Sequence, residues 1–421
     1  MSSIPPFIKR IVIVVSAWLL LATVPAAARQ DQPARTILIG FSGALSGVSE
    51  TFGKSLANAA DMALGEINRQ NPRIGGQRVL FRLLRQDDRN DPETAVGVAR
   101  RLLQAGVVAV IGTSNSATAQ AVAKIYSDAG VAMVTPAASA AVLSERSLAG
   151  FFRMIGHDGQ AAADLADYAV RVANIRRFAV VDNGSMYGVG VAASFFEEVR
   201  QAGAQVVARE RIGYTTDLRQ VVRRMQRQGA QAMFFGGYSA QSVLLAQSIQ
   251  QEGGGLRLML ANSGAVGSTF LIAARSAANG AMAIESGMPI MSMPGWRRFE
   301  EEYNERFGLH LYGMTPFAYD AAQMLVAAMR QAGSANPRKL IETLHRISFK
   351  GLTGTVAFDG SGNPRNPVFT VFEVREQRWV PLQTYEEYPA GSPRKRAESG
   401  EPGKPYNAGS ASDRTLAEPR H

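Results

Sequence analysis

Short apolar runs alternate with amphipathic stretches along most of the chain. In the first half, strands are predicted at 36–41, 79–84, 107–111 and 131–134. Between the first two runs, apolar residues recur at helical spacing from Leu56 to Ile67. Asp91 followed by Pro92 predicts the beginning of a further helix, and Gly106 predicts its end.

The same alternation begins again in the second half. Strands are predicted at 178–181, 206–212, 233–235 and 256–260. Helices are expected from about Ser116, after Tyr187, from a cap at Asp217 and after Ser239. Strands that alternate with helices predict parallel sheets covered on both faces, so the fold class is α/β with one lobe in each half.

The two ends of the chain have a different composition. Lys9 and Arg10 precede an apolar run at 11–24, and Ala26-Ala27-Ala28 follows. This order is typical of a cleaved signal peptide at 1–28, and the alternative is an uncleaved anchor. The chain contains no cysteine, so no lipid-anchored cysteine can follow the apolar run. Segment 389–421 is rich in Pro, Gly, Ser and charge, which predicts a disordered tail.

The net charge of +10 raises the possibility of nucleic-acid binding. However, Lys and Arg are scattered singly along predicted helices or lie near the ends, and no stretch interleaves them with stacking aromatic residues. A solvated basic surface is therefore the preferred interpretation, and no nucleic-acid partner is expected.

Motifs for catalysis, cofactors and metals are weak. Gly188 and Gly190 lack the third glycine of a dinucleotide-binding loop, and no phosphate-binding G-x-x-x-x-G-K motif occurs. The four histidines are not spaced as metal ligands. Asp87 and Asp88 are interpreted as turn and capping residues, with a metal site as the alternative. We therefore expect no enzyme activity, no cofactor and no metal.

Hydroxyl and amide side chains follow two predicted strands, in segments 113–116 and 137–139. In open parallel sheets, ligands bind outside the carboxyl ends of the strands, where helix N-termini favour anions. These segments are candidate ligand-binding groups. The alternative is that their Ser and Thr residues only cap helices.

The region from 36 to about 385 resembles the leucine/isoleucine/valine-binding type of ABC-transporter substrate-binding protein, which has the type 1 periplasmic-binding fold. The matching segments are GFSGALSGVSETFG, DDRNDPETAV, VIGTSNSATAQAVAKIY, VTPAASAAVLS, FRMIGHDGQ, NGSMYGVG, TTDLRQVVRRM, FFGGYSAQ, FAYDAAQML and GLTGTVAFDGSGNP. The resemblance implies two Rossmann-like lobes joined by a three-crossover hinge. Lobe one is expected at 36–156 plus 288–350, and lobe two at 157–287 plus 351–385.

The resemblance also implies which residues bind the ligand between the lobes. Ser116 corresponds to the hydroxyl that holds the ligand carboxylate. Ala138 corresponds to a residue whose backbone carbonyl accepts from the ligand amine, and Ser139 corresponds to a hydroxyl residue that contacts both ends of the ligand. Tyr187 and Tyr238 correspond to aromatic walls from lobe two. Phe52 corresponds to a position that is often Tyr in the family and lies near the side-chain pocket.

Two departures from the family pattern are informative. Asn262 stands where amino-acid binders usually carry an acid that pairs with the ligand ammonium, and a neutral amide pairs far more weakly. An amide, a urea-like compound, a hydroxy or keto acid and an aromatic acid are therefore alternatives to an α-amino acid. Asn90 and Asn115 occupy two positions that often carry a disulfide in the family.

The resemblance implies a periplasmic solute-binding protein of an ABC importer. Its partners are a small-molecule ligand and an inner-membrane ABC permease with its ATPase, and the protein is expected to be a monomer. The alternative is a ligand-binding sensor domain for a signalling partner.

Export predicts a specific mature N-terminus. Cleavage after Ala28 would leave Arg29 as the first residue of the periplasmic protein. Intact-mass measurement of the protein released from the periplasm would show this shortened chain. A mass that corresponds to the full 421 residues would indicate an uncleaved anchor instead.

Overall fold

Two larger sheets dominate the part of the chain that the computed structural model describes, residues 33–145, 147–261, 264–308, 311–386 and 395–396. The first sheet has the order β2-β3-β1-β4-β5-β6. Its strands are β1 (Arg35–Gly43), β2 (Arg73–Ile74), β3 (Gln77–Asp87), β4 (Ala109–Gly112), β5 (Ala132–Thr135) and β6 (Phe151–Arg153). The pairings from β3 through β6 are parallel, and β2 pairs antiparallel with β3.

The second sheet has the order β16-β15-β14-β11-β10-β9-β7-β8. Its strands are β7 (Arg177–Asp182), β8 (Gln205–Arg211), β9 (Ala232–Gly236), β10 (Arg257–Ala261), β11 (Met282–Ser286), β14 (Val368–Arg375), β15 (Arg378–Glu386) and β16 (Lys395–Arg396). The strands from β8 to β11 are parallel, whereas β14, β15 and β16 join antiparallel. A small hairpin of β12 (Phe349–Gly351) and β13 (Gly354–Val356) lies outside both sheets.

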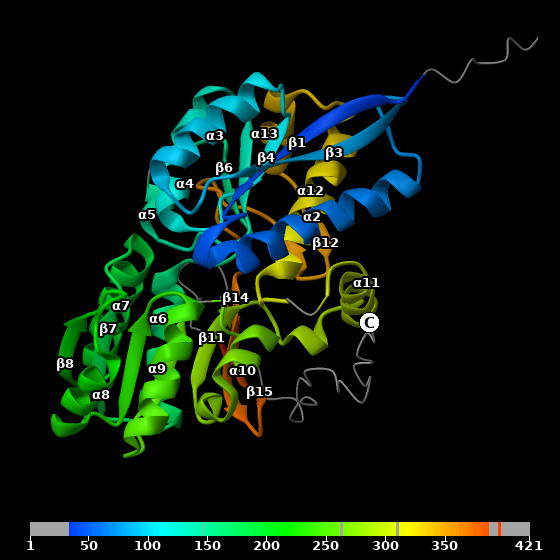
Figure 1. Ribbon diagram of the computed structural model, residues 1–421. Coiled ribbons are helices and arrows are strands. Elements are labelled where there is room, and N and C mark those ends of the chain that lie inside the picture. Colours follow the sequence, from blue (N-terminus) through cyan, green and yellow to red (C-terminus); the bar gives the residue numbers. More distant parts are fainter. Residues whose placement is uncertain (1–32, 146, 262–263, 309–310, 387–394, 397–421) are drawn as a thin grey trace, which may run out of the picture.

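Helices cover both faces of each sheet, as alternating strands and helices require (Figure 1). The first lobe carries α2 (Glu50–Arg69), α3 (Pro92–Gln104), α4 (Ser116–Asp128), α5 (Val142–Glu145), α11 (Trp296–Phe307), α12 (Thr315–Ala332) and α13 (Pro337–Leu344). The second lobe carries α6 (Asp158–Asp167), α7 (Met186–Gln201), α8 (Leu218–Arg227), α9 (Ser239–Glu252) and α10 (Ser268–Ala274). Shorter helical turns are η1 (Gly47–Ser49), η2 (Tyr168–Val172), η3 (Arg275–Ala278) and η4 (Ile290–Ser292).

Each sheet has a separate hydrophobic core on each of its faces. In the first lobe, α2, α11 and α12 pack on one face and α3 and α4 on the other. In the second lobe, α6 and α7 cover one face and α8, α9 and α10 the other. The parallel strands are accordingly apolar on both sides, as in β4, where every residue is buried. The predicted α/β fold with two lobes is confirmed.

The local signals in the sequence also appear where they were predicted. Asp91 caps α3 and accepts a hydrogen bond from the Thr94 N–H at 2.7 Å. Asp217 caps α8 by accepting from two backbone N–H groups. Helix α4 begins at Ser116, as expected.

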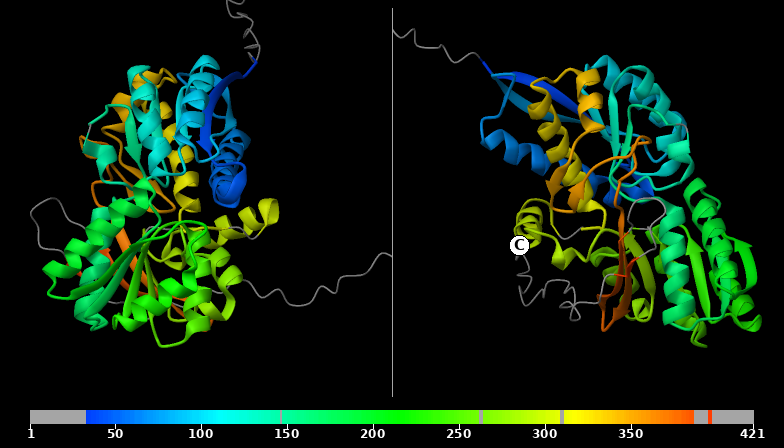
Figure 2. Two further views of the ribbon diagram at one scale, coloured as in Figure 1. Left: turned by 60° about the vertical axis from the view of Figure 1, so that its left-hand side comes forward. Right: turned by 180° about the vertical axis from the view of Figure 1, so that it is seen from behind.

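Within the described residues, the chain passes between the lobes in three connections, which lie between β6 and α6, between β11 and α11, and between β13 and β14. The views in Figure 2 show the last of these leading into β14 of the lower lobe. The third connection differs from the expected boundary at 351. Leu352, Val356 and Phe358 pack in the core of the first lobe, because the hairpin of β12 and β13 precedes the crossover. The precise limits of the lobes otherwise stay a prediction.

The expected signal peptide at 1–28 lies outside the described residues, as does most of the expected tail at 389–421. Within that tail, β16 pairs with the end of β15, which differs from the expectation of disorder for those two residues. An edge strand offers unpaired backbone groups that another segment can satisfy. No helix in the described ranges is both long and apolar enough to cross a membrane.

Asp320 of α12 holds the hairpin that leads into the third connection. Its carboxylate accepts from the Leu352 N–H at 2.9 Å and from the Thr353 N–H and hydroxyl at 2.7 and 2.6 Å. We expect Asp320→Ala to lower the free energy of unfolding in urea by roughly 3 kcal/mol, because one buried and two half-buried donors lose their acceptor.

The matched control is Asp128→Ala at the end of α4. Asp128 pairs with Lys124 across one helical turn, and both side chains are 63% exposed. This control should change stability by less than about 0.5 kcal/mol. Equal losses in the two variants would contradict a structural role for Asp320.

Candidate ligand-binding site

A small cavity lies between the lobes, at the carboxyl ends of strands from both sheets. It is lined by Phe52, Ser114, Asn115, Ser116, Ala137, Ser139, Tyr187, Tyr238 and Met314. Segments that follow β4 and β5 form one wall, and residues that follow β7 and β9 form the other. This is the position at which ligands bind in open parallel sheets.

The first-lobe wall is formed by the beginning of α4. The Asn115 side chain caps this helix and accepts a hydrogen bond from the Thr118 N–H at 2.9 Å. The Ser116 hydroxyl oxygen accepts from the Ala140 N–H at 3.2 Å, so its own hydrogen can be donated to another acceptor. A helix N-terminus also carries a partial positive charge. This wall is therefore suited to an anionic group.

The loop after β5 is fixed against α4 by backbone and hydroxyl contacts. The Thr135 hydroxyl donates to the Thr113 carbonyl at 2.9 Å and accepts from the Ala138 N–H at 2.9 Å. These bonds place Ala137 and Ser139 at the cavity surface. The geometry of the wall thus depends on hydroxyl groups that lie behind it.

The second-lobe wall consists of two stacked tyrosines. The Tyr187 and Tyr238 rings lie 5.6 Å apart at an angle of 23°. The Tyr187 hydroxyl donates to the Ala261 carbonyl at the end of β10. Burial raises the pKa of both phenols, so both stay protonated at neutral pH. The two rings offer flat apolar surfaces, and the bond to Ala261 together with the stacking fixes their position.

Two buried carboxylates lie near this tyrosine pair. Asp158 at the start of α6 and Glu285 in β11 are 2% and 3% exposed. After burial itself, these two charges are the next causes that raise the pKa of Tyr187. Glu285 also accepts from the Ala265 N–H at 3.2 Å, in the loop that follows β10. Both carboxylates therefore lie close enough to Tyr187 to disfavour ionisation of its phenol.

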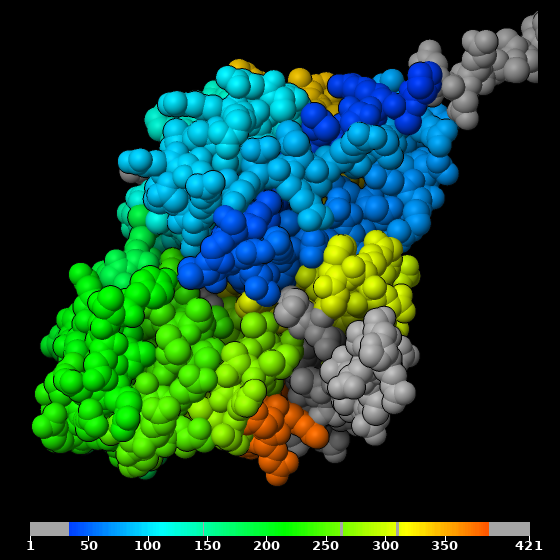
Figure 3. All heavy atoms as spheres, in the orientation of Figure 1, coloured from blue at the N-terminus to red at the C-terminus, as the bar shows by residue number. Residues whose placement is uncertain are grey.

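Phe52 and Met314 close the cavity from the first lobe. Phe52 packs edge-to-face against Tyr312, with ring centroids 5.1 Å apart. The cavity encloses about 30 Å³, whereas sites for small metabolites typically measure at least about 300 Å³. Figure 3 shows atoms of the two lobes in contact along their boundary. A metabolite could therefore enter only if the lobes move apart.

The structure brings most of the predicted site residues together. Phe52, Ser116, Ser139, Tyr187 and Tyr238 all line the cavity. Ala138 lies between two lining residues and is fully buried. Asn262 lies outside the described residues. The individual binding roles of these residues stay predictions.

Other lining residues were not assigned a ligand contact from the sequence. Ser114, Asn115 and Ala137 belong to the hydroxyl- and amide-bearing segments that the sequence singled out. No feature of the sequence indicated Met314 as a site residue, because it reaches the cavity through the packing of α12 on α2.

The structure also shows the contacts of the two asparagines at the family's disulfide positions and of the aspartate pair before α3. Asn90 and Asn115 are adjacent, and the Asn115 side-chain amide donates to the Asn90 carbonyl oxygen. Asp87 and Asp88 accept from backbone N–H groups of their own turn, at Arg89 and Asn90. The interpretation of the two aspartates as turn residues is confirmed.

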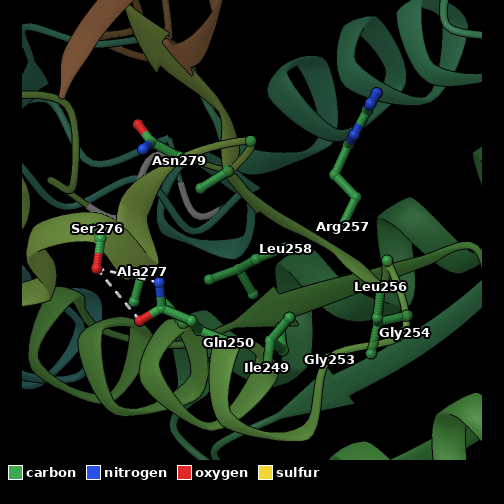
Figure 4. Close-up of a pocket in the computed structure, with 14 residues that line it drawn as sticks. Ile249, Gln250, Gly253, Gly254, Leu256, Arg257, Leu258, Ser276, Ala277 and Asn279 are labelled. Carbon is green, nitrogen blue, oxygen red and sulfur yellow. Dashed lines mark hydrogen bonds between the residues drawn. The ribbon is translucent and has the colours of Figure 1, made fainter. Parts of the chain in front are cut away.

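A second cavity of about 570 Å³ lies at the opposite end of the second sheet, beside the start of β10 and the end of α9 (Figure 4). Its floor includes Leu256 and Leu258. At its rim, Gln250 donates to the Ser276 hydroxyl at 3.0 Å. It contains none of the predicted site residues, and these rim groups bond to each other. The smaller cavity between the lobes is therefore the better candidate site.

A family model described as periplasmic binding protein matches residues 36–378. The chain belongs to the periplasmic binding protein family. It is therefore a solute-binding protein with the predicted type 1 fold.

Curated relatives support the same classification. A leucine-, isoleucine-, valine-, threonine- and alanine-binding protein of Pseudomonas aeruginosa is 28% identical, and the match covers 82% of this chain and 92% of the relative. A leucine-specific-binding protein of Salmonella typhimurium is 26% identical over 83% of this chain and 94% of the relative.

Solved structures share the fold at lower sequence identity. A branched-chain amino acid transporter substrate-binding protein of Streptococcus pneumoniae, in complex with isoleucine, has a TM-score of 0.75 at 21% identity and covers 82% of this chain and 98% of its own. A solute-binding protein of Rhodopseudomonas palustris BisB5, in complex with 3,4-dihydroxybenzoic acid, has a TM-score of 0.74 at 19% identity. The match covers 83% of this chain and 97% of that protein.

The first connection between the lobes contains a titratable group, His157. Burial, together with the charge of Arg153, lowers the pKa of His157 to about 4. An unfolded histidine has a pKa near 6.5. Its contribution to stability is therefore present above about pH 6.5 and is lost as the pH falls toward about 4, because the unfolded chain then binds the extra proton.

We expect His157→Gln to reduce this pH dependence. Urea unfolding at pH 7 and pH 4.5 should show that the wild type loses at least about 1 kcal/mol more than the variant over this interval. Equal losses in the two proteins would show that His157 does not contribute to the acid sensitivity.

Proposed function

We propose that this protein is the solute-binding component of an ABC importer and that its ligand is a small carboxylic acid with an apolar body. One observation carries this proposal: the cavity between the lobes places the beginning of α4 opposite a stacked pair of tyrosines. One wall is suited to an anion and the other to an apolar surface.

The carboxylate would lie at the beginning of α4. The Ser116 hydroxyl can donate to it, and the first-turn N–H groups of the helix add partial positive charge. None of the described lining residues is Lys or Arg, so the binding groups for the anion are neutral donors. Closure of the lobes would exclude water and strengthen these hydrogen bonds.

The rest of the ligand would lie among Phe52, Met314, Tyr187 and Tyr238, which offer aromatic and thioether surfaces. The relatives named above are named for binding aliphatic amino acids and threonine, and the solved structures contain isoleucine or 3,4-dihydroxybenzoic acid. These ligands share a carboxylate and an apolar body but differ in the ammonium group. This shared chemistry supports the proposed class.

The ammonium group is where this chain departs from the amino-acid binders. The neutral residue Asn262 would add little affinity for a cation. The proposed ligand class therefore includes acids that lack an amine.

Transport requires that the protein be exported and that it dock on a membrane permease. The apolar segment after Lys9 supports export by a cleaved signal peptide. The relatives are named as binding proteins of amino acids, and the solved neighbours as transporter components, which favours a permease with its ATPase over a signalling partner. We infer a monomer without enzyme activity.

Titration calorimetry with matched ligands tests this proposal. We expect L-leucine and 4-methyl-2-oxopentanoate to bind within about tenfold of each other, because the ammonium has a weak partner. Leucinamide, which lacks the carboxylate, should bind at least about a hundredfold more weakly than L-leucine. Benzoate and 4-hydroxybenzoate extend the panel to aromatic acids.

Variants of the cavity wall complete the test. Ser116→Ala should weaken binding of the tightest acid by about tenfold or more, since one hydrogen bond to a charged group is lost. Ser248→Ala removes a buried α9 hydroxyl that bonds within its own helix, and it should leave affinity unchanged. If leucinamide binds as tightly as leucine, or if both variants behave alike, the carboxylate is not held at α4.

A further inference from the structure

Arg153 is a fully buried cation at the point where β6 leads into the first connection between the lobes. Burial lowers its pKa to about 10, so the guanidinium stays charged at neutral pH. The carboxylates of Asp158 and Asp359 counter this effect and compensate part of the buried charge. An arginine in this environment must have its donors satisfied by neighbouring acceptors.

One side of the guanidinium holds the wall of the ligand cavity. Nη1 donates to the carbonyl oxygens of Ser139 and Ala140 at 3.2 and 3.0 Å. Ser139 lines the cavity, and its carbonyl also accepts from the Asp158 N–H at 2.9 Å. The loop after β5 is thus fixed both to Arg153 and to the beginning of α6 in the other lobe.

The other side holds the third connection between the lobes. Nε donates to the Asn363 side-chain oxygen at 2.7 Å, and the Arg153 N–H donates to the Gly362 carbonyl at 2.9 Å. Nη2 donates to the Ser144 hydroxyl, which in turn donates to Asn363 at 2.5 Å.

The segment that Arg153 holds has a defined shape of its own. The Asp359 carboxylate accepts from the N–H groups of Ser361 and Asn363 at 2.8 and 2.9 Å. Gly362 has φ +77°, and a Cβ there would lie 1.9 Å from the Phe151 carbonyl oxygen. Only glycine fits so close to β6. The turn therefore presents Asn363 to Arg153 in a fixed position.

We propose that Arg153 is a positioning residue that joins the Ser139 loop of the cavity to the first and third connections, so that the angle between the lobes and the geometry of the ligand site are set together. The planar guanidinium makes this possible, because its donors point to the loop and to the crossover at once. The inference rests on the proposed function, in which the ligand lies between the lobes.

The experiment measures the separation of the lobes directly. Because the chain contains no cysteine, spin labels on Arg100→Cys in α3 and Arg227→Cys in α8 report one interlobe distance by pulsed electron paramagnetic resonance. Asn363→Ala removes the crossover partner of Arg153 without touching the cavity residues. Arg153→Lys keeps the charge but loses the planar fork.

The matched control is Asn68→Ala. Asn68 is also half-buried, and its side chain bonds to the N–H and carbonyl of Phe81 at 2.9 and 2.8 Å, within lobe one. All proteins are measured without ligand, and melting temperatures are recorded in parallel. The result therefore does not depend on which acid binds, and a failure of the ligand assignment would be seen separately by calorimetry.

We expect Asn363→Ala and Arg153→Lys to widen the interlobe distance distribution by about twofold, since a constraint at the hinge is lost. Asn68→Ala should lower the melting temperature but leave the distribution as in the wild type. If Asn363→Ala also lowers only the melting temperature, Arg153 has a purely structural role and the proposal is overturned. If Arg153→Lys does not fold, Asn363→Ala decides the question alone.

Discussion

Parallel pairing of strands places all their carboxyl ends at the same edge of a sheet, and the site depends on this constraint. In this protein, two such edges face each other across the gap between the lobes. The residues that follow β4 and β5 therefore meet those that follow β7 and β9, although more than a hundred positions separate Ser116 from Tyr238. Neither lobe contains the complete cavity, so its lining residues come together only when the two lobes approach each other.

The polar groups around the cavity divide by charge. The beginning of α4 offers hydrogen-bond donors and a partial positive charge, whereas the buried carboxylates of Asp158 and Glu285 act on Tyr187 in the second lobe. In the proposed function, this arrangement would orient a ligand that carries a negative charge at one end. It also explains why both tyrosines remain neutral donors, since burial and the nearby carboxylates disfavour phenolate.

Much of this arrangement could be predicted from local sequence. Caps such as Asp91 and Asp217, and the apolar runs of the parallel strands, are short-range signals that the structure reproduces. Ser116 and Ser139 follow predicted strands, and the general rule for parallel sheets is enough to make them candidates. The family resemblance added Phe52 and the two tyrosines, which no spacing rule indicates.

What could not be predicted depends on contacts between distant segments. β14 and β15 join the second sheet antiparallel, from a part of the chain that lies beyond most of lobe one. Met314 reaches the cavity through helix packing, and Arg153 meets Asn363 across 210 positions. A single arginine after an apolar pair gives no sign of such a partner. Long-range packing, rather than local propensity, determines these features.

A crystal structure with the tightest-binding acid of the panel tests most directly whether α4 holds the ligand carboxylate. We expect the ligand to lie between the lobes, with a carboxylate oxygen within about 3.2 Å of the Ser116 hydroxyl at the beginning of α4. A ligand in the cavity beside Leu256 and Leu258, or one whose carboxylate points away from α4, would contradict this expectation.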